Sequence, residues 1–231
     1  MLWTDQGGGL RRATTLGLLS LAVACSATPR SSSAGPISPN ELGTILYEAS
    51  HSCPNWRPRS QLADQPPKDI LVEVTLLDAP LAAALRVQQQ DLPRLAQLPE
   101  IRLLGTPHLT GKFDLPATMT LERHFGELDE ATFTRLSIVP RRSDGERLVI
   151  ELELGFLLPN SDPTENPSPT STSWAVEAGY GEPTLRVAKH PGNPKRGLVV
   201  VVKAYPMWSS DDLRTLFECK MRVHQLAIEQ R

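Results

Sequence analysis

Two acidic side chains have a spacing that could support acid–base chemistry. Glu151 and Glu153 alternate in an apolar run, which places both carboxylates on one face of a strand, about 7 Å apart. Paired-carboxylate glycosidases use a similar separation. Neighbouring glutamates on a strand are more often its solvated face, and we expect that here. The sequence contains no nucleophile elbow, no glycine-rich phosphate loop and no His-Glu-x-x-His motif, so we expect a protein without enzymatic activity or a cofactor.

Two binding chemistries remain to be considered: a metal site built on His51 and Cys53, and a sugar site in which tryptophan rings stack on the ligand. His51 and Cys53 are close enough in sequence to share a metal ion. A zinc site needs three or four ligands at recurring spacings, whereas the other four histidines are scattered singly. We therefore expect no metal site. Three tryptophans are interpreted as loop residues that anchor loops or close the core: Trp56, Trp174 and Trp208.

Charge and composition exclude one class of partner. The chain has 24 basic and 26 acidic side chains, a formal net charge of -2. Capture of nucleic acid needs a basic surface, so we expect no nucleic-acid partner. Apolar residues make up 40% of the chain but aromatic residues only 5%, which predicts a core of Leu, Val, Ile and Ala. The 21 prolines favour short elements joined by long connections over a helical bundle.

The first residues have the features of an export signal. Arg11 and Arg12 precede an uncharged apolar run, residues 13–24, that ends in small residues. A basic region, a short apolar run and small residues at its end define a secretory signal. The run is too short to span a bilayer, which takes about 20 residues. We expect residues 1–24 to be removed on export; the alternative is an ordinary buried helix.

The apolar run ends at Cys25. Residues 21–25, Leu-Ala-Val-Ala-Cys, resemble a bacterial lipobox, in which the cysteine is lipidated and becomes the new N-terminus. The resemblance implies a lipid anchor on Cys25, a flexible tether over residues 25–37 and, because Ser26 follows the cysteine, the outer membrane. Ala22 stands where the pattern prefers a branched apolar residue. Plain cleavage before the cysteine, which leaves a soluble secreted protein, therefore stays open.

If Cys25 carries a lipid, two cysteines remain in an oxidising compartment. Cys53 and Cys219 could then form a disulfide. It would close a loop of more than 160 residues, which the chain-entropy model rates at roughly 4–5 kcal/mol. Two unpaired buried thiols are the alternative.

Hydrophobic periodicity predicts an α+β domain over residues 38–231, with a mainly antiparallel sheet and flanking helices. Helices are predicted over 39–50, from Asp78 toward Gln90, and over 210–229. Strands are predicted over 70–77, 101–104, 117–125, 134–139, 148–157, 185–187 and 198–205. Residues 159–173 lack large apolar side chains and are predicted to form a mobile loop. The last helix carries an apolar stripe, interpreted as core-facing: Leu213, Leu216, Phe217, Met221 and Ile228.

The order of these elements from residue 69 to about residue 204 resembles the β-domain of bacterial secretins, the ring-forming gates of type II and type III secretion and of type IV pili. The similar pieces are the strand and helix that begin at residue 70, the short strand leading to Pro107, the alanine-led strand at 117, the two strands around the Asp144-Gly145 turn, and the closing strand 196–202. The resemblance implies a role in assembly or protein interaction.

These observations predict a non-enzymatic envelope lipoprotein of the outer membrane or periplasm, held to the membrane through Cys25. It would bind other envelope proteins or copies of itself through sheet edges and the 159–173 loop. Two alternatives remain open: a soluble secreted periplasmic binding protein for polysaccharide or peptide, and an enzyme whose dispersed site the sequence does not reveal.

Overall fold

The computed structural model describes residues 37–229, except residues 52, 54–66, 99, 124–131, 144–146 and 159–167. The predicted leader, Cys25 and the tether up to residue 36 lie outside these residues. The helices are α1 (Pro39–Ser50), α2 (Leu81–Ala84), the 3-10 helix η1 (Gln89–Asp91), α3 (Leu92–Leu95) and α4 (Ser210–Glu229). The strands are β1 (Asp69–Pro80), β2 (Arg102–Gly105), β3 (His108–Gly111), β4 (Ala117–Arg123), β5 (Thr132–Arg142), β6 (Arg147–Leu158), β7 (Ser168–Gly179), β8 (Thr184–His190) and β9 (Asn193–Met207).

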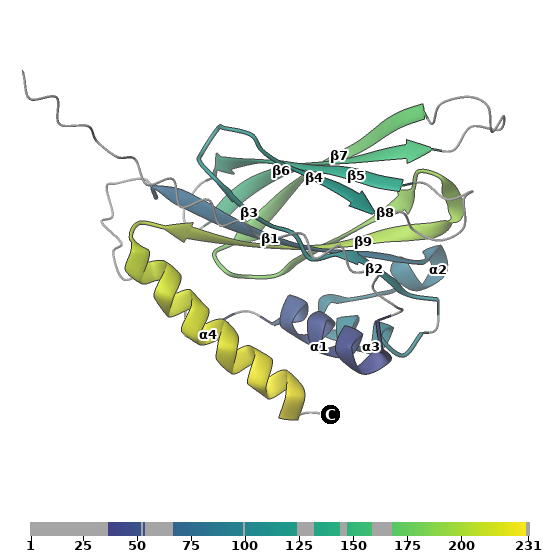
Figure 1. Ribbon diagram of the computed structural model, residues 1–231, viewed down its shortest axis with the longest axis horizontal. Coiled ribbons are helices and arrows are strands. Elements are labelled where there is room, and N and C mark those ends of the chain that lie inside the picture. The colour runs from purple at the N-terminus through teal and green to yellow at the C-terminus, as the bar shows by residue number, and fades with distance from the viewer. Residues whose placement is uncertain are drawn as a thin grey trace, which may run out of the picture. The chain divides into compact units, whose positions relative to one another are not determined.

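Two antiparallel sheets lie face to face, and the helices cover the far side of one of them (Figure 1). The five-stranded sheet has the order β2-β1-β9-β8, and β3 also pairs with β1. The four-stranded sheet has the order β4-β5-β6-β7. Its strands follow one another in the chain, whereas β1 and β9 come from opposite ends of the domain and pair from Asp69↔Met207 to Pro80↔Arg196. The predicted α+β fold with a mainly antiparallel sheet is confirmed.

Strand alternation builds the core between the two sheets. Successive side chains of a strand point to opposite faces, so the even-numbered residues from Ile70 to Leu76 in β1 and from Leu198 to Ala204 in β9 face the four-stranded sheet. Their partners come chiefly from β6, whose even-numbered residues from Leu148 to Phe156 are all buried. Burial of one such side chain stabilises the fold by roughly 1.5–3 kcal/mol. The run 198–202 in β9 is buried on both faces, as predicted, because Val199 and Val201 pack against the helices.

The helix at the start of the domain forms where the sequence predicts it. Ser38 is the N-cap, and its hydroxyl accepts a hydrogen bond from the Glu41 N–H at 3.2 Å. One face of α1, including Leu42 and Leu46, packs against α3 and the five-stranded sheet.

The helix predicted from Asp78 toward Gln90 is wrong in its start and its length: Asp78 belongs to β1, where it pairs with Arg196 and caps no helix, and α2 spans only Leu81–Ala84. The short helices η1 and α3 follow.

The predicted orientation of the last helix is largely wrong. Of its predicted core-facing stripe, only Leu216 is buried, at 1% exposed. Leu216 and Val223 pack against Tyr205 and Met207 at the end of β9. Polar contacts and a disulfide, described below, fix the rotation of α4 and leave the rest of the stripe in solvent.

Part of the predicted 159–173 loop is a strand. Residues 168–173 belong to β7 and pair in register with β6, from Ser168↔Leu158 to Ser173↔Glu153. A β-ladder satisfies the backbone of this segment without large apolar side chains, which explains the error. Residues 159–167 lie outside the described residues. Trp174 is likewise a strand residue of β7, packed at the margin of the core, and not a loop residue.

Candidate functional site

The start of α4 is fixed by a buried carboxylate. Asp212 is fully buried, and its Oδ2 accepts hydrogen bonds from the backbone N–H groups of Trp208 and Ser209, both at 2.9 Å. A carboxylate in the first turn satisfies amides that lack a partner within the helix and interacts favourably with the helix dipole. The helix therefore leaves β9 at a fixed angle.

Further along, α4 is joined to the sheet by a charged cluster formed by Glu73, Lys203 and Lys220. The Glu73 carboxylate in β1 lies between the ammonium groups of Lys203 in β9, at 3.6 Å, and Lys220 in α4. The side chains of Glu73 and Lys203 are 8% and 9% exposed. Each buried charge therefore has a countercharge, as buried charges require.

The charged cluster extends to the end of α1. The Lys203 ammonium donates a hydrogen bond to the backbone carbonyl of Glu48 at 2.7 Å. Glu48 lies in the last turn of α1, where the partial negative charge of the helix dipole favours a cation. The Glu48 carboxylate in turn contacts the imidazole of His224 in α4. Three separate segments, α1, the paired strands β1 and β9, and α4, are thus held together by polar side chains.

Proximity and burial oppose each other in setting the pKa values of this cluster. For Glu73, burial is the largest single influence, and by itself it raises the pKa of the carboxyl group. The neighbouring Lys220 and Lys203 ammonium groups together outweigh burial and hold the pKa of Glu73 below its usual value. Burial lowers the pKa of Lys203, and the Glu73 carboxylate opposes that effect. Glu73 is therefore ionised at neutral pH.

A disulfide joins the segment after α1 to α4. The structure pairs Cys53 with Cys219, whose Cα atoms are 5.8 Å apart, across 166 residues of chain. That separation lies within the usual range for bonded cysteines. His51 and Cys53, by contrast, form no metal site with other residues: among the described side chains, no three His, Cys, Asp or Glu residues are grouped to hold a metal ion.

The solvent side of α4 carries a row of exposed apolar side chains, here called the α4 stripe. Its members and their exposed fractions are Leu213 (53%), Phe217 (64%), Met221 (53%) and Ile228 (50%). Contiguous exposed apolar patches of a few hundred Å² mark interaction sites in many soluble proteins. The α4 stripe is the main apolar surface that the sequence interpretation assigned to the core.

The outer face of the four-stranded sheet is polar. Glu151 forms two hydrogen bonds, each 3.0 Å, with the guanidinium of Arg141, and Glu153 pairs with Arg135 at 2.8 Å. On the same face, Arg147 pairs with Glu177 of β7 at 2.9 Å. These charged pairs cross the strands in a row, and their members are well exposed, so each contributes little to stability.

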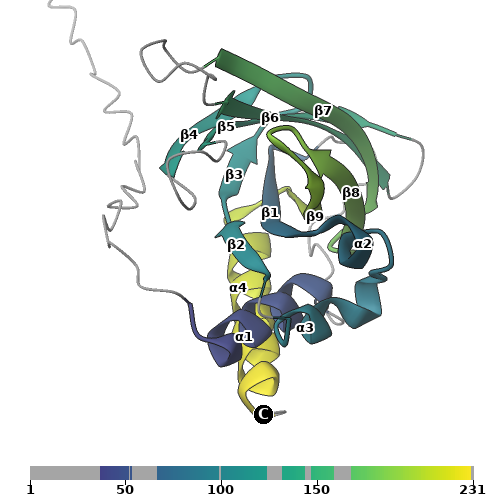
Figure 2. The same ribbon diagram turned by 90° about the vertical axis from the view of Figure 1, so that its right-hand side faces the viewer.

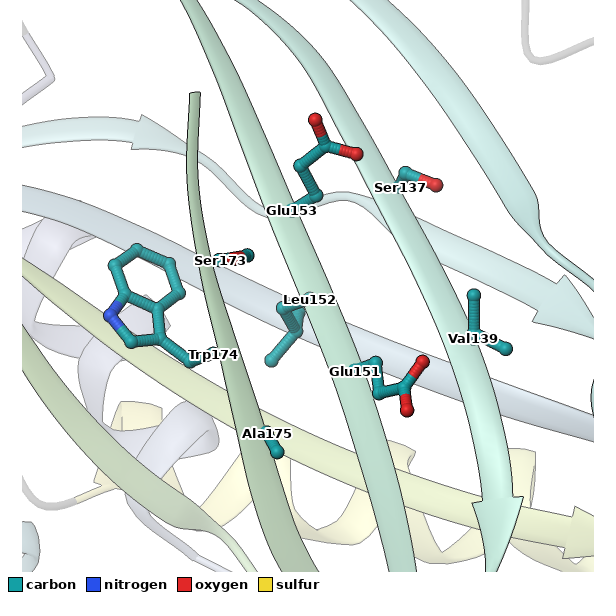
Figure 3. A pocket seen from close by; sticks show the side chains of 8 residues that line it. All are labelled: Ser137, Val139, Glu151, Leu152, Glu153, Ser173, Trp174 and Ala175. Atoms are coloured by element: carbon teal, nitrogen blue, oxygen red, sulfur yellow. The ribbon is translucent and has the colours of Figure 1, made fainter. Parts of the chain in front are cut away.

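A shallow depression of about 390 Å³ lies on this face (Figure 3). Figure 3 shows Glu151 and Glu153 along β6, with side chains of β5 on one side and of β7 on the other. Its lining residues are Ser137, Val139, Glu151, Leu152, Glu153, Ser173, Trp174 and Ala175. Because both carboxylates are paired with arginine, they are placed as the solvated face that the sequence predicted and not as a free acid–base pair.

The outer edges of the sheets differ in how they are protected. β7 is an edge strand of the four-stranded sheet and pairs only with β6 among the described strands; Figure 2 shows it along the margin of that sheet. From residue 168 to residue 176 it carries no charged side chain. β8, at the edge of the other sheet, carries Arg186 and Lys189. Charged side chains and proline on an edge discourage pairing with another strand, so β7 after Pro169 is a less protected edge than β8.

The charged cluster was missed by sequence reasoning, although a signal for it exists. Alternation places Glu73 on the face of the strand opposite Val72 and Val74, and Leu71 and Leu77 share the face of Glu73. Lys203 directly follows a run of four valines. A charge inside a strand with two apolar faces requires a buried partner, although sequence alone does not identify it. Among the described residues, no helix has both the length and the hydropathy needed to cross a membrane.

Comparisons with known proteins give only distant similarities. No family model matches the sequence, and no curated protein sequence matches it. Among solved structures, the chain is similar to the type II secretion system secretin XcpQ from Pseudomonas aeruginosa, with 17% identity over 70% of this chain and a TM-score of 0.40. It is also similar to the secretin GspD of Escherichia coli K12, with 14% identity over 73% of this chain and a TM-score of 0.40.

A third similar structure is the type II secretion system outer membrane complex of Klebsiella pneumoniae, containing PulD, PulS and PulC, with 13% identity over 74% of this chain and a TM-score of 0.41. This chain covers 64%, 56% and 45% of the length of the three matched chains. With TM-scores below 0.5 and identities below 20%, these similarities do not assign a function to this chain.

Proposed function

We propose that this chain is an exported envelope lipoprotein without enzymatic activity, anchored through Cys25, whose secretin-like β-domain serves assembly or protein interaction. The observation that carries the proposal is the edge of β7. A strand of 12 residues pairs on one side only among the described strands, and its first half carries no charge and consists of serine and threonine apart from Pro169. Such an edge can accept another strand through main-chain hydrogen bonds.

The site chemistry supports an interaction role over catalysis. The candidate acid–base pair, Glu151 and Glu153, is engaged by arginines on an exposed face. The buried charges of the charged cluster are engaged by one another and by the end of α1. Both groups hold elements of the fold together, which is a structural use of charged residues.

The anchor is tested by the mass of the mature N-terminal peptide in cells that process bacterial lipoproteins. The expected result is a peptide that begins at Cys25 and carries acyl chains, with the Cys25→Ala variant released from the membrane fraction. An unmodified N-terminus, or an intact chain that starts at Met1 in the cytosol, would refute the anchor.

The interaction edge is tested by site-specific photo-cross-linking in the envelope. A photoreactive residue replaces Ser171 in β7, and the matched control replaces Thr106, an exposed residue between β2 and β3. We expect Ser171 to give a discrete product, whose mass identifies a second copy or another envelope protein, and Thr106 to give none. Ser173→Lys should abolish that product, because charge blocks strand addition. The interaction role of β7 fails if Ser171 gives no product.

A further inference from the structure

α4 has two apolar faces. Successive residues of a helix are rotated by about 100°, so the buried residues Leu216, Val223 and Ala227 fall within an arc of about 40°. The α4 stripe falls within an arc of about 80° whose centre is about 100° away from that of the buried face. The buried face anchors α4 to the body of the protein, and the stripe is a separate surface.

The spacing along this second face fits another helix. Phe217, Met221, His224 and Ile228 follow one another at intervals of four, three and four residues, the spacing of the a and d positions of a coiled coil. His224 lies at the inner margin of this face, where its ring contacts Glu48 of α1. A strand or an irregular peptide would not match side chains that recur once per helical turn.

The charges beside the stripe favour an antiparallel partner of the same sequence. Arg214, Glu218, Gln225 and Glu229 lie on one flank, within an arc of about 60°. In an antiparallel two-fold pair, equivalent flanks meet in reversed order. Within one chain Arg214 pairs with Glu218 at 3.9 Å, and Gln225 donates a hydrogen bond to Glu229 at 3.0 Å. In the pair these exposed contacts are exchanged: Arg214 lies close to Glu229 of the second copy, and the Gln225 amide can donate to Glu218 of that copy. A parallel pair would place each charge beside its own copy and align the two helix dipoles unfavourably.

We propose that α4 is a homodimerisation helix that pairs antiparallel with α4 of a second copy through the α4 stripe. In this register Phe217 packs against Ile228 of the second copy, and Met221 lies beside His224 of the second copy. The two-fold axis lies at the height between Arg222 and Val223, the midpoint of both pairs. The surface is independent of the β7 edge and of export, so the two proposals stand or fall separately.

The size of the surface predicts a weak dimer in solution. A 20-residue helix is about 30 Å long, and four half-exposed side chains per copy bury less area than a standard interface. We expect a dissociation constant on the order of 10 μM. Attachment of both copies to one membrane would raise their effective concentration and favour the dimer further.

The first test measures mass against concentration. The protein is residues 26–231, which retains the compact unit that starts at residue 36, and sedimentation equilibrium is recorded between about 1 and 200 μM. We expect a monomer–dimer equilibrium that Phe217→Ser weakens at least tenfold. The matched control is Leu226→Ser, which removes a side chain of similar exposure (48%) from the other side of α4 and should leave the equilibrium unchanged.

A cross-link tests the geometry. With a short bis-maleimide, Met221→Cys should give covalent dimers because this position lies near the two-fold axis, whereas Leu226→Cys should give none. Exchange of charge tests the direction: Arg214→Glu and Glu229→Arg alone should each weaken the dimer several-fold, and the double variant should restore it.

Several outcomes would overturn the proposal. One is a monomer at every concentration; another is a dimer that persists in Phe217→Ser. Larger oligomers that form regardless of Phe217 would assign assembly to another surface, such as β7, and leave the proposed function intact. Binding of the monomer to phosphatidylethanolamine–phosphatidylglycerol vesicles that depends on Phe217 would identify the stripe as a membrane contact instead.

Discussion

Removal of the Glu73 carboxylate tests whether the charged cluster locks α4 onto the sheet. Glu73→Gln keeps the shape of the side chain but leaves the Lys203 ammonium buried without its countercharge. Loss of one member of a buried ion pair costs roughly 3–5 kcal/mol. Lys220 is 32% exposed and can turn to solvent, so we expect the lower end, about 3 kcal/mol. With a urea m-value of about 2 kcal/mol/M, the unfolding midpoint should fall by about 1.5 M.

The assay is urea unfolding followed by circular dichroism at pH 7 with the disulfide intact. The matched control is Glu153→Gln, which removes a carboxylate from an exposed pair with Arg135 and should change the free energy of unfolding by less than about 1 kcal/mol. The double variant Glu73→Gln with Lys203→Met should recover much of the loss, because an apolar pair can replace a buried ion pair.

The pH dependence gives a second readout. Since the folded state holds the pKa of Glu73 below its usual value of 4.5, the stabilisation from its ionised carboxylate is present above about pH 4.5 and is lost as the pH falls through the folded pKa. The difference in stability between wild type and Glu73→Gln should therefore shrink in acid. An equal difference at pH 7 and pH 3, or a loss at pH 7 no larger than that of Glu153→Gln, would refute this account.

Three further changes distinguish the parts of the fold. Cys219→Ser should lower the free energy of unfolding by roughly 4–5 kcal/mol in the chain-entropy model, and reduction of the wild type should give the same shift in urea midpoint; a wild type insensitive to reductant would contradict the pairing. Leu216→Ala, at a buried position, should cost about 2–4 kcal/mol, whereas Phe217→Ala in the monomer should cost less than about 0.5 kcal/mol in the same urea titration. Gly197→Ala should lower the thermal midpoint, because a Cβ there would lie 2.9 Å from the Cβ of Ala84 and push α2 off β9; an unchanged midpoint would show that α2 moves freely.

The sequence predicted most of the secondary structure because local signals agree with the fold. Helix α1 begins and ends at the predicted residues, since Ser38 and Pro39 mark its start and the apolar spacing continues to Ala49. Alternation identified β1, β5 and β6, whose two faces meet different environments. Local signals do not show which strands pair. That β1 and β9, far apart in the chain, are neighbours in one sheet is seen only in the structure.

The errors share one cause: burial was inferred from composition, whereas backbone pairing and specific partners decide it. Residues 168–173 are polar and were interpreted as a loop, but a neighbouring strand suffices to hold them. Glu73 is polar and lies in a buried strand, where two lysines distant in sequence make its burial tolerable. In both cases the sequence shows the residues but not the distant partner that allows them to be paired or buried.

The α4 stripe shows how a partner decides which apolar residues are core. Leu216 and Phe217 are adjacent in the sequence and equally apolar, yet one is buried and the other is 64% exposed. The rotation of α4 is set by Cys219 and Lys220, which lie on its inner side and reach Cys53 and Glu73. If the fold had only to bury apolar area, a rotation of about 100° about the helix axis would bring the α4 stripe inward in place of Leu216, Val223 and Ala227. The disulfide of Cys219 and the ion pair of Lys220 prevent that rotation. They therefore keep the α4 stripe exposed to solvent, where a partner can bind it.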